Sequence, residues 1–281
     1  RPPAEGIEDG VTIRNDTGVY EGGEISIHYD PMIAKLVTHA PTRAEAIAAQ
    51  AEALDAFAIE SIRHNIPFLS ALMAHPRWQS GQLSTGFIAE EFPDGFQVLA
   101  PRGEMIAVFA AIATSIDHIL NERKRAISGQ MRAARPVRFD RERIVVMEAL
   151  RLKIRVEDDG QSLHLFMVEK GAALTVQTNW TPGQPVWVGQ VNGVDVSAHV
   201  RGALNGVIIS HGGAGVTARV LTYREAELFA LIPPPEAVDS GKHLLCPMPG
   251  LVKMLDVTVG QQIKIGEVLC IVEAMKMENV L

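Results

Sequence analysis

The sequence has few cysteines, fewer basic than acidic residues and no long apolar run. Its two cysteines, Cys246 and Cys270, form no disulfide framework and have no metal-ligand spacing, so we expect a reducing compartment. The net charge of -7 disfavours a nucleic-acid partner, which would select a basic face. Since no apolar run approaches the roughly 18–20 residues that span a bilayer, no membrane partner is expected either.

The rest of the composition is that of an ordinary globular protein, with 47% hydrophobic and 21% charged residues. A length of 281 residues suits about two domains. The nine histidines are scattered, and no pair combines metal-ligand spacing with a carboxylate, so no metal site is predicted. The first residue is Arg1, without a methionine or a signal peptide, and we therefore expect a piece of a longer chain.

Strand and helix signals alternate in the first third of the chain. Residues 1–40 favour strands and turns. Thr42 and Glu45 then form a capping box in front of a segment rich in helix formers. A second helix is predicted from Asn65, as N-cap, to a stop before Pro76. The first third is therefore expected to be α+β.

The central part combines one apolar helix with many short strands. The cluster EFPDGF (91–96) indicates a boundary, and residues 104–122 predict a helix that is apolar nearly all round and must be buried all round. From 136 to 232, β-rich runs follow one another, with a strong hairpin signal at Asn192-Gly193. Strands without intervening helices imply antiparallel pairing, in a sandwich or in a barrel. A barrel closed around the helix satisfies both observations.

Two further central segments resemble functional motifs, but each has a simpler structural interpretation. SHGGAG (210–215) is rich in glycine but lacks the G-K-[ST] of a phosphate loop, so a hairpin turn is the better interpretation. The segment 121–138 is basic, but no aromatic residues interleave, so a solvated helix end or a subunit contact is favoured over nucleic-acid binding.

The last fifty residues favour a linker and a small all-β unit. Three consecutive prolines within 231–243 indicate an extended spacer. In VEAMKMENVL (272–281) an apolar strand leads into a polar tip, and as a hairpin this places Lys276 at an exposed turn. The preceding β-branched strand argues against a helix there. An ordinary solvent-exposed lysine at position 276 is an alternative interpretation of the same residues.

The motif AMKM, preceded by PMPG and VGQQIKIGEVLCIVE, resembles the biotinyl domain of biotin-dependent carboxylases. The resemblance implies that a biotin protein ligase joins biotin to Lys276 through an amide and recognises the neighbouring Ala274, Met275 and Met277. The related lipoyl domains lack paired methionines. Biotinyl domains resemble two half-domains with the lysine hairpin between them, and this sequence carries only the first half.

The N-terminal segment resembles the C-terminal subdomain of biotin carboxylase, through YDPMIAKL and STGFIAEEFPDGF. Asp30 and Lys35 of this segment are read as a structural ion pair or as surface charges. The resemblance implies that the ATP-grasp region, which binds ATP, magnesium and bicarbonate, lies upstream of this sequence. No catalytic residue is therefore assigned within it.

The central part looks like the subunit-docking domain in the α subunits of propionyl-CoA and 3-methylcrotonyl-CoA carboxylases. RPVRF, TNWTPGQPVWVGQVNGVD and LTYREAELFALIP are most similar to the propionyl-CoA enzymes. The implied fold is α+β and multidomain. It comprises the end of a biotin carboxylase domain (1–97), a docking domain with a helix in an antiparallel barrel (98–232), a linker (233–243) and a partial biotinyl domain (244–281).

These resemblances imply a role in carboxyl transfer. Biotin on Lys276 is carboxylated with ATP and bicarbonate, and the carboxyl group passes to a β-subunit carboxyltransferase acting on propionyl-CoA. The alternatives are a 3-methylcrotonyl-CoA carboxylase α subunit, and a non-enzymatic β-rich interaction protein with an unmodified surface lysine. The β subunit is expected to bind through residues 98–232. The compartment would be the cytoplasm of a bacterium or the mitochondrial matrix of a eukaryote.

Overall fold

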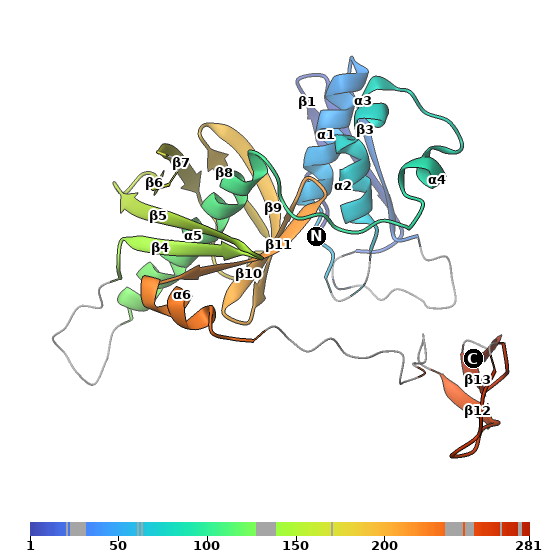
Figure 1. The fold of residues 1–281 in the computed structure, drawn as a ribbon. Helices are drawn as coiled ribbons and strands as arrows, with labels where there is room; N and C mark the ends of the chain where they lie inside the picture. Colours follow the sequence, from blue (N-terminus) through green and yellow to red (C-terminus); the bar gives the residue numbers. More distant parts are fainter. Residues whose placement is uncertain are drawn as a thin grey trace. The chain divides into compact units, whose positions relative to one another are not determined.

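The computed structural model describes residues 1–20, 22, 32–60, 62, 64–127, 139–169, 171–233, 244, 250–264, 266–274 and 277–281. The described residues divide into two compact units, one reaching to Leu231 and the other beginning at Ile232 (Figure 1). Most of the predicted linker lies outside the described residues.

A sheet and four helices form the first part of unit 1. The sheet is antiparallel, in the order β1 (Gly6–Glu8), β2 (Val11–Thr17), β3 (Ala34–His39). The helices are α1 (Arg43–Ala56), α2 (Ile66–Ala74), α3 (Pro76–Ser80) and α4 (Phe87–Glu91). Buried apolar side chains from α1, α2 and α4, among them Leu54, Leu72 and Phe87, make a common core. This confirms the predicted α+β class.

The helix boundaries follow local signals. The hydroxyl of Thr42 accepts a hydrogen bond from the Glu45 amide, and the Glu45 carboxylate accepts one from the Thr42 amide, which completes the predicted capping box of α1. Asn65 precedes α2 as predicted, although its side chain makes no capping bond, and the helix stops before Pro76. The short helices α3 and α4 were not predicted, because each has only five residues.

Eight antiparallel strands form a closed barrel in the second part of unit 1. They are β4 (Glu142–Met147), β5 (Leu150–Asp158), β6 (Leu163–Met167), β7 (Ala172–Thr178), β8 (Val186–Val191), β9 (Val194–Ala203), β10 (Gly206–His211) and β11 (Ala214–Leu221). Neighbours in sequence pair with one another, and the pairing of β11 with β4 closes the ring. The barrel, not the sandwich, is therefore the correct alternative.

The two predicted barrel turns are hairpin turns. Asn192 and Gly193, between β8 and β9, have φ angles of 53° and 77°. Gly212 and Gly213, between β10 and β11, have φ angles of 57° and 77°. Positive φ at both central residues matches the right-handed twist of the flanking strands. The glycine-rich SHGGAG segment is thus a hairpin turn, as predicted.

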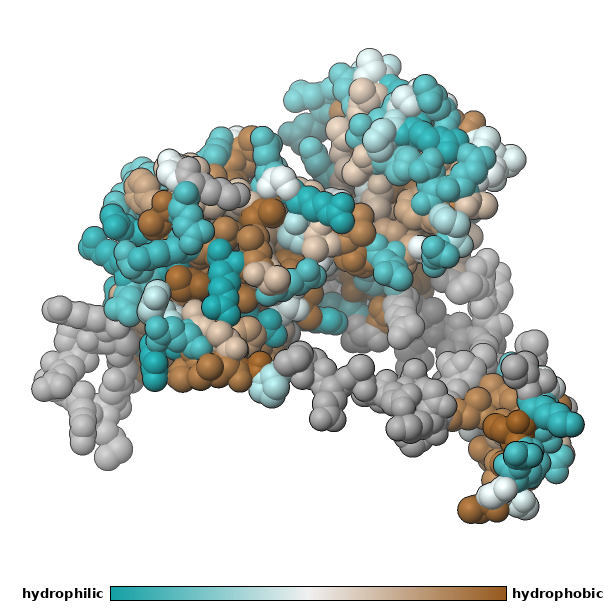
Figure 2. All heavy atoms as spheres, in the orientation of Figure 1, coloured by the Kyte–Doolittle hydropathy of each residue, from teal (hydrophilic) through white to brown (hydrophobic). Residues whose placement is uncertain are grey.

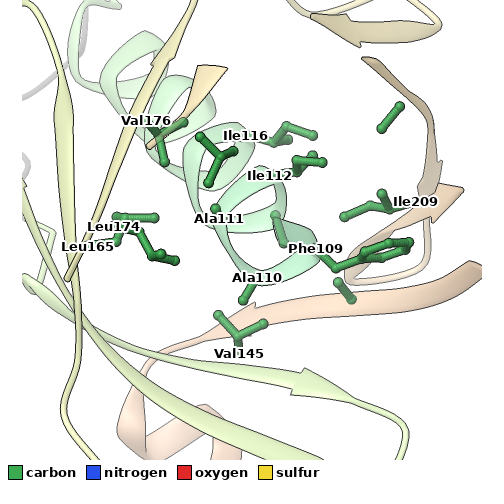
Figure 3. Packing of buried hydrophobic residues seen from close by; sticks show 14 of the residues in the cluster. Phe109, Ala110, Ala111, Ile112, Ile116, Val145, Leu165, Leu174, Val176 and Ile209 are labelled. Carbon is green, nitrogen blue, oxygen red and sulfur yellow. The ribbon is translucent and has the colours of Figure 1, made fainter. Parts of the chain in front are cut away.

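Helix α5 (Met105–Arg125) lies inside the barrel (Figures 1 and 3). Phe109, Ala110, Ala111 and Ile112 are fully buried. Figure 3 shows side chains of Val145, Leu165 and Ile209 around the helix. Among the described residues, α5 alone has the length and composition to cross a membrane, but enclosure by the barrel accounts for its apolar surface. The predicted buried helix is confirmed and ends three residues later than Glu122.

One helix interrupts the region that was expected to hold only strands. Helix α6 (Tyr223–Phe229) follows β11 and begins at a second capping box, formed by Thr222 and Glu225. The T-x-x-E signal is visible in the sequence. The expectation of strands up to residue 232 was wrong here, because the capping box outweighs the β-rich context.

The described part of unit 2 is a three-stranded antiparallel sheet, which confirms the all-β prediction. It consists of β12 (Leu251–Leu255), β13 (Cys270–Ala274) and β14 (Met277–Val280), in that order. Cys270 and Val272 are buried, whereas all five residues of β12 are exposed. Figure 2 shows hydrophobic residues at the surface of this unit.

Candidate functional site

The hairpin of β13 and β14 is the candidate carrier site. Its register runs from the pair Ile271–Val280 to the pair Ala274–Met277. Its base is closed by Cys270 and Leu281, whose amides each donate to the other's carbonyl, at 3.1 Å and 2.8 Å. The buried side chain of Val272 anchors the middle of the hairpin. The hairpin is thus fixed at its base and centre.

The predicted site residues lie at the opposite end of this hairpin. Ala274 and Met277 are the last register pair. Met275 and Lys276, which join the two strands in the sequence, lie outside the described residues, and so do the side chains of Ala274 and Met277. The strand pairing thus agrees with the predicted hairpin, while the role of Lys276 stays a prediction.

Acidic residues flank the lysine position on both strands. Glu273 and Glu278 are register partners, one pair away from Ala274–Met277. The backbone register thus places both acidic positions next to the last pair of the hairpin, while the side chain of Glu278 lies outside the described residues.

The candidate docking domain is held together by polar bonds as well as by apolar packing. The indole Nε1 of Trp187 on β8 donates to the Ser115 hydroxyl on α5, over 3.1 Å, and both residues are fully buried. The Ser115 hydroxyl in turn donates to the Ile112 carbonyl, over 2.8 Å. Because a buried donor without a partner is costly, this bond fixes the rotation of α5 inside the barrel.

A polar cluster that the sequence did not reveal lies between α5 and the barrel wall. The carboxylate of Asp117 accepts from Arg143 Nε at 3.1 Å and from the Asn121 amide at 2.9 Å. Burial raises the pKa of Asp117, and this effect outweighs the opposing influence of Arg143. The cluster borders a polar cavity of about 450 Å³. Arg143 is 26 positions from Asp117 in the chain, so no local motif marked their contact.

Two further predictions concern a metal site and an ion pair. No group of three or more His, Cys, Asp or Glu side chains could hold a metal ion within the part of the chain that the structure describes. Lys35 is exposed on β3, and Asp30 lies outside the described residues, so their suggested ion pair stays untested.

Three protein families match successive parts of this chain. Residues 4–90 match the biotin carboxylase C-terminal domain. Residues 109–234, which include the barrel, match the propionyl-coenzyme A carboxylase BT domain. Residues 242–281, which include the hairpin, match the family described as biotin-requiring enzyme.

Curated relatives match nearly the whole length of this chain. The chain is 44% identical to the propionyl-CoA carboxylase alpha chain of Ruegeria pomeroyi, over 96% of this chain and 40% of that protein. It is 29% identical to the human mitochondrial protein of the same name, over 95% of this chain and 37% of the relative. It is also 29% identical to the methylcrotonoyl-CoA carboxylase subunit alpha of Dictyostelium discoideum, over 95% of this chain and 39% of that relative. The chain thus spans about two fifths of the length of these relatives.

Proposed function

We propose that this chain is the carrier and docking part of a biotin-dependent acyl-CoA carboxylase α subunit. Its successive parts match the biotin carboxylase C-terminal domain, the propionyl-CoA carboxylase BT domain and the biotin-requiring enzyme family. The observation that carries this proposal is the presence of all three domain types in one chain. A surface lysine on an unrelated β-rich protein would not come with the other two domains.

Lys276 is the proposed site of biotin attachment. The paired strands β13 and β14 leave only Met275 and Lys276 to join them, which suits presentation of a lysine to a biotin protein ligase. The lysine amine, once deprotonated, would attack the carbonyl of a biotinyl group activated by the ligase. The amide C–N bond would form as the bond to the activating group breaks, and the nitrogen would lose a proton. Ala274, Met275 and Met277 are the proposed recognition residues for the ligase. When bound, biotin supplies a ureido nitrogen that can accept a carboxyl group and give it up elsewhere.

The barrel is the proposed docking element for a carboxyltransferase β subunit. It coincides with the match to the BT domain, and α5 makes it rigid from within. Its outer surface exposes apolar side chains, including Val188 on β8 and Leu204 between β9 and β10. Exposed apolar groups on a rigid support suit a lasting protein contact.

The proposed acyl substrate is propionyl-CoA, and the acyl-CoA site belongs to the β subunit. Identity is higher to the bacterial propionyl-CoA carboxylase chain than to the methylcrotonoyl-CoA carboxylase subunit, at 44% against 29%. ATP, magnesium and bicarbonate are assigned to the upstream carboxylase region. The proposed compartment is the cytoplasm of a bacterium or the mitochondrial matrix of a eukaryote.

The test is Lys276→Arg in the complete protein. Arginine keeps the positive charge, but its guanidinium stays protonated and is a poor nucleophile, so biotin should not be attached. We expect no biotin by mass spectrometry or streptavidin blot, no overall carboxylation of propionyl-CoA, and retained ATP-dependent carboxylation of free biotin.

Lys264→Arg is the matched control, because Lys264 is an exposed lysine in the same unit. This variant should keep its biotin and its overall activity. Biotin on another lysine in the Lys276→Arg protein, or persistent overall carboxylation, would refute the assignment. A wild-type protein without any biotin signal would favour the non-enzymatic alternative.

A further inference from the structure

The turn between β10 and β11 contacts the N-terminal part of unit 1. The carboxylate of Asp55, at the end of α1, accepts the backbone N–H of Gly212, with both oxygens at 3.1 Å. The same carboxylate lies 2.9 Å from Nδ1 of His211. Asp55 is only 6% exposed, so its charge depends on these partners. The contact joins residues that are more than 150 positions apart in the chain.

Gly213 brings the turn directly against α2. A Cβ atom at this position would meet the backbone of Ala71 at 2.6–2.7 Å, which no side chain can tolerate. The φ angle of +77° also favours glycine. The glycines of SHGGAG therefore serve close contact between two parts of the chain as well as the turn itself.

A second imidazole of the barrel contacts the same helix end. Nε2 of His199, on β9, lies 3.3 Å from the Leu54 carbonyl in the last turn of α1. The last carbonyls of a helix are partly negative and favour donors and cations. Two barrel histidines thus face the C-terminal end of α1, one at a carbonyl and one at a carboxylate.

We propose that the His211–Gly213 turn is the joint that fixes the carboxylase C-terminal domain to the barrel, and that the charge on His211 sets its strength. Nδ1 of His211 also lies 2.9 Å from the Ser197 carbonyl. Since both partners of Nδ1 are acceptors, this nitrogen carries a proton in either charge state. Protonation of the other ring nitrogen then adds a positive charge beside Asp55.

The surroundings of the joint allow this titration. A cavity of about 430 Å³ borders it and is lined in part by the half-buried His211. The cavity is also lined by the charged or titratable side chains of Glu60, His64, His199 and Arg201. Phe109 of α5 lies on another side of His211, with ring centres 6.4 Å apart, and carries no charge.

The histidines of the joint respond to pH in opposite directions. Burial lowers the pKa of His211, but the hydrogen bond and charge of Asp55 and the Ser197 carbonyl outweigh burial and raise it overall. Burial lowers the pKa of His199 and of His64. The contribution of His211 is complete below its unfolded pKa of about 6.5 and is lost as pH rises through its higher folded pKa. The contributions of His64 and His199 are lost as pH falls from about 6.5 through their lower folded pKa values.

The joint should therefore be strongest near pH 6.5 and weaker on either side. Hydrogen exchange of the complete protein, followed by mass spectrometry over residues 206–218 and corrected for the intrinsic pH dependence of exchange, measures its opening. We expect protection to peak near pH 6.5 in the wild type. Protection that is flat or rises steadily through this range would overturn the role of His211.

Three variants distinguish the effect of the hydrogen bonds to Asp55 from the effect of the charge on His211. Asp55→Asn should speed exchange of this segment by about tenfold, because it removes a charged acceptor. His211→Ala should do the same. His211→Asn keeps a donor at the position of Nδ1 but cannot titrate, so protection should persist while its decline above pH 6.5 disappears.

His118→Gln is the matched control. Nε2 of His118 pairs with Asp158 at 2.9 Å, and this pair takes no part in the joint. The control should leave both protection and its pH profile unchanged. Wild-type protection in Asp55→Asn would refute the joint itself, and a wild-type pH profile in His211→Asn would refute its dependence on charge. Neither outcome bears on the biotin site.

Discussion

At the scale of one residue, hydrogen bonds stabilise the charged carboxylate of Asp159 in the turn between β5 and β6. Its carboxylate accepts hydrogen bonds from the backbone amides of Gln161 and Ser162, at 2.9 Å and 2.7 Å, and lies 2.8 Å from Nε2 of His164. The bond to His164, followed by those to the two amides, lowers the pKa of Asp159 to about 2. A short acidic side chain thus orders the connection between β5 and β6.

The pKa of Asp159 is open to direct measurement. Carbon-detected NMR should find this carboxyl titrating at about 2. Because the pKa of Asp159 is lower in the folded protein, the charged carboxylate stabilises the fold at pH values above the unfolded pKa near 3.9. This stabilisation is lost as the pH falls toward 2. His164→Ala should move the pKa upward. An unchanged value of about 2 in that variant would contradict His164 as the main cause.

At the scale of elements, the sequence predicted structures that depend on neighbouring residues, but it did not predict contacts between residues far apart in the chain. The capping box at Thr42, the Asn192-Gly193 turn and the apolar helix at residues 104–122 each depend on neighbouring residues, and all three were predicted correctly. Helix α6 was missed because its seven residues directly follow a long run of strands. The contact of Asp55 with His211 has no local signature. Lys276 was predicted through a motif, and the structure describes the two strands that flank it.

The dependence of the barrel on α5 can be tested by truncating one side chain. Phe109 is fully buried at the centre of the barrel core, so Phe109→Ala should lower the free energy of unfolding by about 3–5 kcal/mol. Leu120 lies on the same helix but is 37% exposed, so Leu120→Ala should cost about 1 kcal/mol or less. Urea unfolding of both variants gives the comparison. Equal losses in the two would show that α5 is not enclosed as described.

At the scale of the whole molecule, the two units suit different tasks. Unit 1 combines two buried cores with the polar joint at Asp55, so it can hold a fixed geometry. The described part of unit 2 buries little beyond Cys270 and Val272, and strand β12 is exposed along its length. Three strands with a hydrophobic face are about the minimum for a sheet that is stable on its own. The division matches the proposed roles, a rigid scaffold for docking and a small unit for carrying biotin.

This division predicts that docking and carrying can be separated. A protein truncated after Leu231 keeps the barrel and loses the segment of unit 2 that begins at Ile232. On the proposed function, it should still co-elute with the carboxyltransferase β subunit in size-exclusion chromatography, should unfold at the wild-type temperature, and should carry no biotin. The Lys276→Arg protein is the control, because it also lacks biotin but keeps unit 2. If the truncated protein failed to bind the β subunit while Lys276→Arg still bound it, unit 2 would have to supply part of the docking surface, since the loss of biotin is common to both.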